Sequence, residues 1–499
     1  EVSYWPNLGY GRFGSRVTMD MSPWYDSIDM FNQQRIRLAD VDGSGLIDVI
    51  YVGRDGIYIY FNQSGNSWSR AHKLPYRPQI DNLTSVTVVD LMGNGTACLV
   101  WSSSLPGDFG RQMRYIDLMA GIKPHLLVSV KNNMGAETRV HYVSSTEFYL
   151  NDRAAGQPWI TRLPFPVHVV DKVEVYDRLS RNRFSTRYSY HHGYFDGVER
   201  EFRGFARVDQ LDTEEFAALS KSDAFPVGDN VDLASHVPAV LTRTWFHTGA
   251  YLDGRKISGQ LEREYYREGD PSMGETGLSE EQLRSMLLDD TVLPQDLSAE
   301  EMREACRSLK GSVLRQEIYA IDGTEEEDRP YSVSERNYTI KRLQPQGINK
   351  YAVFFTHSRE TIDFHYERKL YKVSGGVLAD QISPPPDAKN AADPRVSHSM
   401  TLAVDDYGNV LKAMAIGYGR RFKDPSLTEE DQGRQMRTEV TLTLNSYTNA
   451  IIENDAYRAP LPSETRTFEV INVETTPAQG GVNVLLKLDE MIELVEGTD

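Results

Sequence analysis

The sequence has few cysteines and no long apolar segment. Cys98 and Cys306 are the only cysteines in 499 residues, which excludes a disulfide-dense scaffold and leaves the redox compartment open. No run approaches the roughly 18 consecutive apolar residues of a membrane helix, so we expect no direct membrane insertion. The chain begins at Glu1 without a signal-peptide pattern, and we expect it to be a piece of a longer polypeptide.

The chain also lacks an excess of positive charge. It has 54 Lys and Arg against 72 Asp and Glu, a formal net charge of −18 at pH 7. Nucleic-acid binding relies on clustered Lys and Arg, so no nucleic-acid partner is expected. Hydrophobic residues make up 40% and charged residues 25%, as in ordinary folded proteins. At this length, two or more structural units are expected.

No catalytic motif stands out. The sequence has no Gly-x-Ser-x-Gly elbow, no His-Glu-x-x-His, no phosphate-binding loop and no strand-to-helix Gly-x-Gly-x-x-Gly. Cys306 lies in a helical apolar pattern, which favours a core residue over a nucleophile. His191 and His192 are adjacent in an expected strand, so their side chains should point to opposite faces and serve structure rather than zinc. The sequence therefore predicts that the chain is not an enzyme.

What is abundant is the composition of β-structure. The 27 Tyr and 18 Phe suit half-buried pleated surfaces. The first hundred residues hold a diverged repeat, residues 35–52 and 85–101, in which an apolar strand, an acidic Gly-rich turn and a second apolar strand follow one another. Asp40 and Asp90 are 50 positions apart, close to the length of a four-stranded propeller blade. Two copies cannot close a propeller, so we expect residues 1–124 to be terminal blades of an incomplete one.

From residue 125 the pattern changes to long alternating strands, which predict large antiparallel sheets over 125–273 and 311–499. Between them, residues 274–310 predict a small helical hairpin inserted at the surface, because Ser279 with Gln282 and Ser298 with Glu301 form capping boxes. Residues 188–197 predict a strand, a turn and a strand. The proline-rich stretch 383–394 predicts a loop. Expected strands cover 126–131, 137–143, 167–170, 172–176, 184–190, 312–319, 331–334, 351–355, 361–366 and 440–444.

The first acidic turn is a candidate metal site. Asp40, Asp42, Ser44 and Asp48 place oxygen-bearing side chains around a tight Gly turn, which suits a hard cation such as calcium. Tyr51 stands where an EF-hand would need its twelfth-position Glu, so the EF-hand interpretation fails. The alternative is an Asp-rich turn held by its own side-chain-to-backbone hydrogen bonds. In the second copy Leu91, Met92 and Cys98 replace the needed ligands, and no metal is expected there.

Several longer strings carry a resemblance. Residues 38–48 (LADVDGSGLID) occur in many propellers. More specific are MGAET at 134–138, LPFPVHVV at 163–170, YHHGYFDGVEREFRGF at 190–205, FHYER at 364–368, DDYGNVL at 405–411 and AIGYGRR at 415–421. These strings, spread over nearly the whole chain, resemble the B component of the bacterial insecticidal Tc toxin complexes.

The resemblance implies an architecture and partners. It implies a propeller that docks on and gates the channel-forming A component, and a hollow β-shell, built with the C component, that encloses a cytotoxic cargo. The chain would then be a secreted, non-enzymatic structural component. Two alternatives stay open. A calcium-binding adhesion or receptor-binding propeller should show several intact Asp-rich turns, and only one is intact. An ADP-ribosylating toxin should show a Ser-Thr-Ser strand before a Glu-x-Glu, and none precedes residues 325–327.

Overall fold

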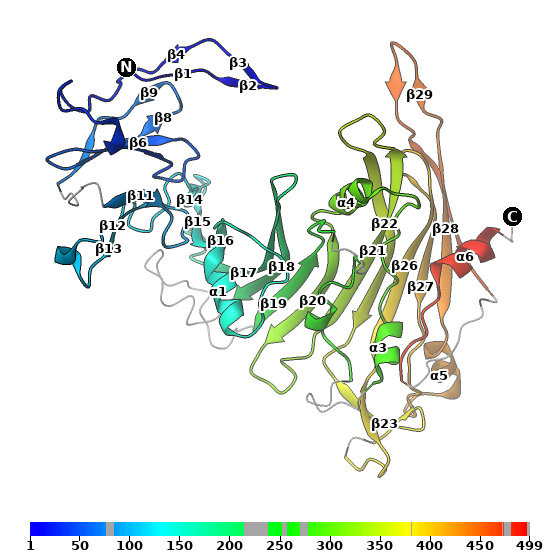
Figure 1. The fold of residues 1–499 in the computed structure, drawn as a ribbon. Helices are drawn as coiled ribbons and strands as arrows, with labels where there is room; N and C mark the ends of the chain where they lie inside the picture. The colour runs from blue at the N-terminus through cyan, green and yellow to red at the C-terminus, as the bar shows by residue number, and fades with distance from the viewer. Residues whose placement is uncertain are drawn as a thin grey trace. The chain divides into compact units, whose positions relative to one another are not determined.

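The computed structural model describes residues 1–75, 84–213, 238–251, 257–269, 278–380, 382–471, 473 and 481–496. The chain divides into two compact units. Unit 1 comprises Glu1–Pro158 and Leu163–Leu179, and unit 2 comprises Trp159–Arg162 and Ser180–Asp499. Both units consist mainly of antiparallel strands (Figure 1). The all-β class with large antiparallel sheets and a few short helices is confirmed.

Unit 1 holds small sheets followed by longer strands. A four-stranded antiparallel meander has the order β10-β7-β6-β5, and a three-stranded one has the order β11-β12-β13. The later strands pair in the order β14-β15-β16. Their bounds are β5 Ile36–Ala39, β6 Asp48–Val52, β7 Ile57–Tyr60, β10 His72–Leu74, β11 Ser85–Val89, β12 Cys98–Ser102, β13 Met113–Asp117, β14 Ser129–Lys131, β15 Ala136–Ser144, helix α1 Ser145–Ala154 and β16 His168–Asp177.

Short pairs complete unit 1. Strand β1 pairs with β4, β2 with β3, and β8 with β9. The core of the unit lies between the two meanders, where Ile50, Ile57 and Leu99 are fully buried in one cluster. The bounds are β1 Ser3–Tyr4, β2 Asn7–Gly9, β3 Arg12–Phe13, β4 Val17–Thr18, β8 Asn62–Gln63, β9 Ser67–Trp68, and the 3-10 turns η1 Gln33–Arg35 and η2 Pro106–Asp108.

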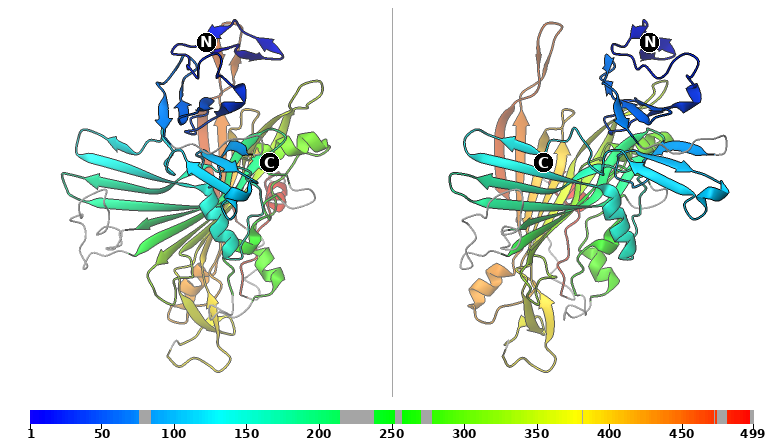
Figure 2. Two further views of the ribbon diagram at one scale, coloured as in Figure 1. Left: turned by 60° about the vertical axis from the view of Figure 1, so that its left-hand side comes forward. Right: turned by 90° about the vertical axis from the view of Figure 1, so that its left-hand side faces the viewer.

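Unit 2 is dominated by long strands that pair side by side (Figures 1 and 2). Their order is β17-β18-β19-β20-β21-β22-β26-β27-β28-β31. The bounds are β17 Arg183–Asp196, β18 Glu201–Thr213, β19 Ala239–Phe246, β20 Val313–Ile321, β21 Ser332–Gln344, β22 Val353–His365, β26 Arg395–Val404, β27 Val410–Gly417, β28 Glu439–Tyr447 and β31 Pro462–Glu469.

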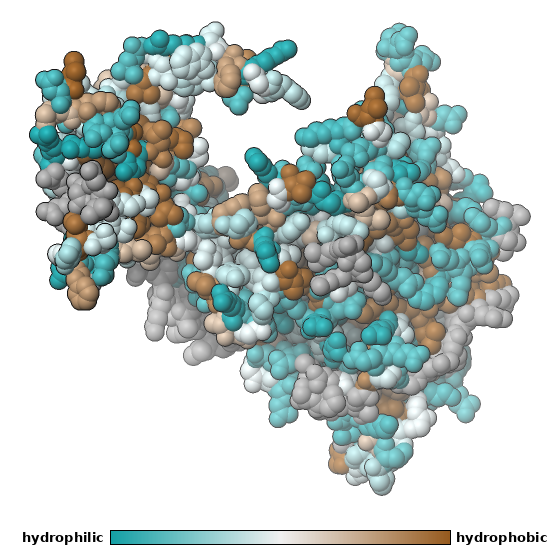
Figure 3. All heavy atoms as spheres, in the orientation of Figure 1, coloured by the Kyte–Doolittle hydropathy of each residue, from teal (hydrophilic) through white to brown (hydrophobic). Residues whose placement is uncertain are grey.

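Unit 2 also contains smaller sheets and short helices. Strands β23 (Leu370–Ser374), β24 (Val377–Leu378) and β25 (Lys389–Ala392) form a separate sheet, and β29 (Ile451–Ile452) pairs with β30 (Tyr457–Arg458). The helices are η4 Glu262–Glu264, α3 Glu280–Ser285, α4 Ala299–Arg307, α5 Glu429–Gln435 and α6 Leu488–Glu496. The β29–β30 hairpin projects and carries apolar spheres near its end in Figure 3, where Ile452 and Tyr457 are highly exposed.

Because polar and apolar residues alternate along the strands, one face of this sheet is apolar, and that face is buried. Val333, Phe364 and Val396 lie opposite one another on three neighbouring strands, and each is at most 4% exposed. They pack under Met286, just after α3, and under Leu485 near the C-terminus. Further along, Met400 and Met414 pack under α6. The strands are thus covered on this face by other segments of the same chain.

The helical segment differs from its prediction in one respect. Both capping boxes are present, since Ser279 and Gln282 begin α3 and Ser298 and Glu301 begin α4. The helices do not form a hairpin, however. Residues beside α3 pack in the cluster of Val333 and Phe364, whereas α4 packs with Ile340 in another cluster. Each helix is short, and it buries its apolar side against the nearest strands instead of against the other helix.

Four further predictions need correction. Residues 167–170 and 172–176, predicted as separate strands, form the single strand β16, and residues 351–355 and 361–366 likewise form β22. The predicted turn inside 188–197 is a bulge within β17, where the register shifts near Gly193. The predicted loop 383–394 contains β25, which pairs with β23, because its four residues lie between the prolines and keep their amide donors.

The covered face predicts a strong effect of truncating its core. Ile362 is fully buried in the cluster under α3. We expect Ile362→Ala to lower the free energy of unfolding by about 2–5 kcal/mol, since burial is lost and a cavity remains. Chemical denaturation measures the change. Val353→Ala, at an exposed position of the same strand, should change stability by less than about 0.5 kcal/mol, and equal effects of the two variants would contradict the assignment of the buried face.

Candidate functional site

The structure brings the predicted metal residues of unit 1 together. Asp40, Asp42 and Asp48 each offer a carboxylate oxygen, and these oxygens all lie within 4.8 Å of one another. Ser44 lies in the same turn, where its hydroxyl oxygen is 3.4 Å from the amide nitrogen of Leu46. The turn needs Gly43 and Gly45, because both adopt positive φ angles that disfavour side chains.

The carboxylates of this turn already accept backbone hydrogen bonds. Asp40 accepts from the amides of Ser44 and Gly45 at 3.0 and 2.8 Å. Asp48 accepts from the amides of Val41 and Asn62 at 2.9 and 2.8 Å. This is the self-bonded Asp turn that the sequence allowed as the alternative to a metal site.

The electrostatics of the turn nevertheless suit a cation. Burial raises the pKa of Asp48, two amide donors partly offset this, and the neighbouring carboxylates of Asp42 and Asp40 raise it further. Burial also acts to raise the pKa of Asp42, but hydrogen bonds from Ser44 and His125 outweigh it and lower that pKa. Oxygen ligands at this spacing match the donor set of calcium, and a bound cation would relieve the repulsion between the carboxylates.

The second copy shows what the turn requires. Asp90 accepts from the amides of Asn94 and Gly95 at 3.1 and 2.7 Å, as Asp40 does in the first copy. Met92 and Cys98 occupy the positions of Asp42 and Asp48. The same backbone turn therefore forms with one carboxylate, and the two additional carboxylates of the first copy are not needed for its shape.

In unit 2, a strap of residues 261–268 crosses the covered face and is anchored by Glu264. The Glu264 carboxylate accepts hydrogen bonds from His192 Nε2 at 2.5 Å and Arg207 at 2.8 Å. His192 Nδ1 accepts from the amide of Ile160 at 3.1 Å, and it adopts a φ of 57° in the bulge of β17. These contacts give His192 the structural role that the sequence predicts for it. Its neighbour His191 lies 3.7 Å from Asp209.

A second anchor lies beneath the strap. Arg315 contacts Glu317 at 2.7 Å and Glu335 at 3.0 Å, all three side chains being almost fully buried. Glu317 also accepts from the amide of Tyr266, so this cluster holds the strap to the sheet. Sequence analysis missed it. The sequence does carry a signal for this cluster, because Arg315 and Glu317 are charged residues at alternating positions of an apolar strand, on the same side as Tyr319.

A third anchor joins distant segments. Arg421 forms an ion pair with Glu268 of the strap, and its Nε donates to Asn483 at 2.7 Å. Its backbone amide donates to Asp393 at 3.0 Å. Arg421 is fully buried, so its charge is compensated only by these partners. The arrangement ties the strap, the segment that follows β27 and the segment around Asn483 to one another.

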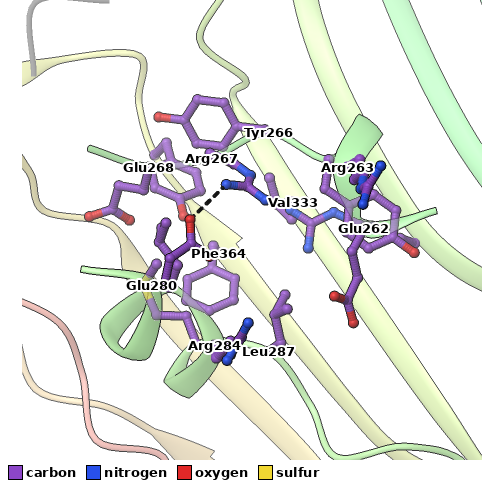
Figure 4. A pocket seen from close by; sticks show the side chains of 15 residues that line it. Glu262, Arg263, Tyr266, Arg267, Glu268, Glu280, Arg284, Leu287, Val333 and Phe364 are labelled. Carbon is purple, nitrogen blue, oxygen red and sulfur yellow. Dashed lines mark hydrogen bonds and ion pairs between the residues drawn. The ribbon is translucent and has the colours of Figure 1, made fainter. Parts of the chain in front are cut away.

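A pocket of about 230 Å³ opens between the strap, α3 and strands β20 to β22 (Figure 4). Its floor is apolar and includes Val333, Phe364 and Tyr366. Arg267 and Glu280 form an ion pair of 3.1 Å at its edge. The sequence offered no signal for this pocket, because its walls come from segments a hundred residues apart.

Both cysteines are core residues, which the sequence predicts for Cys306. Cys306 is fully buried in α4, and burial raises its thiol pKa to about 11. Cys98 is also buried, and burial raises its pKa. A thiol held in its neutral form is a poor nucleophile. Among the described residues, no helix has the length and apolarity needed to cross a bilayer.

Two protein-family models match this chain. A model of the insecticide toxin TcdB middle/N-terminal region matches residues 62–225, and a model of the TcdB middle/C-terminal region matches residues 304–372 and 388–460. Together they match more than half of the chain. The chain belongs to the TcdB insecticide-toxin family. It corresponds to the middle region, and the resemblance found in the sequence is confirmed.

Solved structures agree with this assignment. The TcdB2-TccC3 crystal structure is 28% identical with a TM-score of 0.72, covering 97% of this chain and 22% of that chain. TcdB2-TccC3 without its hypervariable C-terminal region is 29% identical with a TM-score of 0.71, covering 96% and 21%. The Photorhabdus luminescens Tc holotoxin pore is 27% identical with a TM-score of 0.69, covering 97% and 21%.

The solved chains that match are much longer than this chain. The TcdB-family chain described here spans about a fifth of the length of the solved chains that it matches. No curated protein sequence matched it.

The strap anchor predicts a pH dependence of stability. Burial acts to raise the pKa of Glu264, but the hydrogen bonds from His192 and Arg207 and the charge of Arg207 lower it to about 2, against an ordinary 4.5. A carboxylate with a lowered folded-state pKa stabilises the fold above its unfolded pKa, and this contribution is lost as pH falls toward 2.

We therefore expect Glu264→Gln to destabilise the protein by about 1–3 kcal/mol at pH 6, and by less as the pH falls to about 3. Denaturant unfolding of wild type and variant at each pH gives the difference. Glu493→Gln, at an exposed position of α6, is the matched control and should leave the pH profile unchanged. A difference that stays constant across this range would contradict the role of the ionised carboxylate.

Proposed function

We propose that this chain is a non-enzymatic structural component of a secreted insecticidal toxin complex. In this proposal, residues 125–273 and 311–499 form part of the shell that encloses a cytotoxic cargo, and residues 1–124 contribute blades to a propeller that docks on and gates a translocation channel. The observation that carries it is the likeness to TcdB2-TccC3 over 97% of this chain. The partners are a channel-forming A component and a cargo-bearing C component.

The geometry of the strands supports both proposed roles. The order β10-β7-β6-β5 is a four-stranded antiparallel meander, which is the composition of one propeller blade. The neighbouring β11-β12-β13 sheet repeats the acidic turn of the first. The long strands of unit 2 suit a wall, because neighbouring strands pair over many residues and leave few open edges.

A chimera tests the function. Replacing the matching fifth of TcdB2 with this chain should preserve co-purification with TccC3 and a hollow particle in electron micrographs. The physical reason is that strand pairing at the borders depends mainly on backbone hydrogen bonds and register, which a shared fold retains. A chimera that folds, shown by a cooperative thermal transition, but neither binds TccC3 nor encloses a space would contradict the proposal.

Calcium binding at Asp40, Asp42, Ser44 and Asp48 belongs to the same proposal. Its support is the convergence of three carboxylates within 4.8 Å and the raised pKa of Asp48, caused by burial and, to a smaller extent, by repulsion from Asp42 and Asp40. Calcium would hold the turn at the edge of β5 and β6 by ligation of the carboxylates. The alternative adhesion role has no support beyond this one turn, because the second turn lacks two of the carboxylates.

Calcium should raise the melting temperature of the wild-type chain, since a ligand at about 100 times its dissociation constant stabilises by about 2.7 kcal/mol. Asp42→Asn should abolish this shift while keeping an oxygen that accepts from the Ser44 amide. Asp90→Asn in the second turn is the control and should retain the shift. Calorimetry of the three proteins with millimolar calcium checks this, and an unchanged wild-type transition would reject the site.

A further inference from the structure

The pocket of unit 2 has features of a ligand site that the toxin assembly does not explain. It measures about 230 Å³ and lies between the strap, α3 and strands β20 to β22. Val333, Phe364 and Tyr366 of its floor are between 1% and 6% exposed, so the floor belongs to the core and is rigidly packed. Leu283 and Leu287 add apolar surface from the side of α3.

Most charged groups that line the pocket are already compensated. Arg315 is paired with two glutamates beneath the strap. Glu268 is paired with Arg421 on the far side of the strap. Arg267 is paired with Glu280, and Figure 4 shows this pair above the ring of Phe364. None of these pairs needs a ligand for its charge to be balanced.

Three lining groups remain. Glu262, Arg263 and Arg284 form no ion pair with any other described residue. Both arginines are exposed, and Figure 4 shows Arg284 beside Leu287 at the mouth of the pocket. Figure 4 shows Arg263 next to Glu262 on another side of the pocket, so Arg284 is the positive charge beside the apolar lining at Leu287. This sign is opposite to the net charge of −18 of the whole chain.

The combination of size, floor and charge selects a ligand class. A volume of about 230 Å³ lies below the range of roughly 300–1,000 Å³ typical of drug-sized ligands, which leaves room for one ring with a short chain. The apolar floor takes the ring, and a guanidinium at the mouth binds a carboxylate through charge-assisted hydrogen bonds. We propose that this pocket binds a small apolar anion, with an aromatic ring against Phe364 and a carboxylate at Arg284.

This chemistry has two sources. A free aryl-alkyl carboxylic acid presents it, and so does a polypeptide segment in which an acidic residue neighbours an aromatic one. The recognising groups are the same in both cases. Acetylated phenylalanine with a free carboxylate represents the first source. A doubly blocked peptide containing Asp-Phe represents the second. Binding of either one supports the proposal, and their relative affinity identifies the source.

Saturation-transfer NMR on the intact chain tests the proposal with 3-phenylpropionate as the probe. For a ligand of this size we expect a dissociation constant of about 0.1–10 mM. Arg284→Gln should weaken binding at least about fivefold, because the charge-assisted bonds are lost. Arg336→Gln makes the same kind of charge change at an exposed position of β21 and should leave binding unchanged.

Two comparisons make the outcome decisive. 3-Phenylpropylamine has the same ring and chain with the opposite charge, and it should bind at least about tenfold more weakly. Leu287→Glu places a negative charge at the partly buried mouth and should abolish binding of the anion without emptying the core. The proposal is overturned by equal binding of the amine, by unchanged affinity in the Arg284→Gln variant, or by no transfer signal at 10 mM probe, taken as roughly the weakest affinity expected.

Discussion

The structure of unit 2 depends on covering one face of its long antiparallel strands. Alternation along each strand places apolar side chains on one side, and cross-strand register collects them into a continuous surface. Water contact with that surface would cost on the order of 25 cal/mol per Å². Segments beside α3 and α6 therefore pack onto it, and their positions follow from the need to bury Val333, Ile362 and Met414.

Buried charges determine how the covering segments are placed. Apolar contacts tolerate small shifts, whereas an ion pair removed from water needs its partner at hydrogen-bonding distance. Arg315 lies opposite Glu335 in the strand register, and Glu317 binds the strap through the amide of Tyr266. Glu264 adds contacts in the middle of the strap and Glu268 adds a contact at its end. The strap is thus fixed along the sheet, and the pocket exists because its position is fixed.

The acidic turns show a related separation of roles in unit 1. One aspartate in each turn bonds the following amides and shapes the backbone. The glycines that follow adopt positive φ angles, which the turn requires. Asp42 and Asp48 are additional to this shape, and Met92 and Cys98 replace them in the second copy. The two additional carboxylates, which would bind a cation, are therefore not required for the fold of the repeat.

The sequence by itself determined the all-β class, the repeat, both capping boxes, the core position of Cys306 and the family, because these follow from local periodicity, short-range hydrogen bonds and long unusual strings. It also named the residues of the acidic turn, which are close in sequence. Only the tertiary structure decided where α3 and α4 pack, that β25 pairs with β23, and that Glu264, Arg315 and Arg421 anchor a strap over a pocket. Such contacts join residues that are distant in sequence, and their partners are fixed by strand register and by the burial of a whole face.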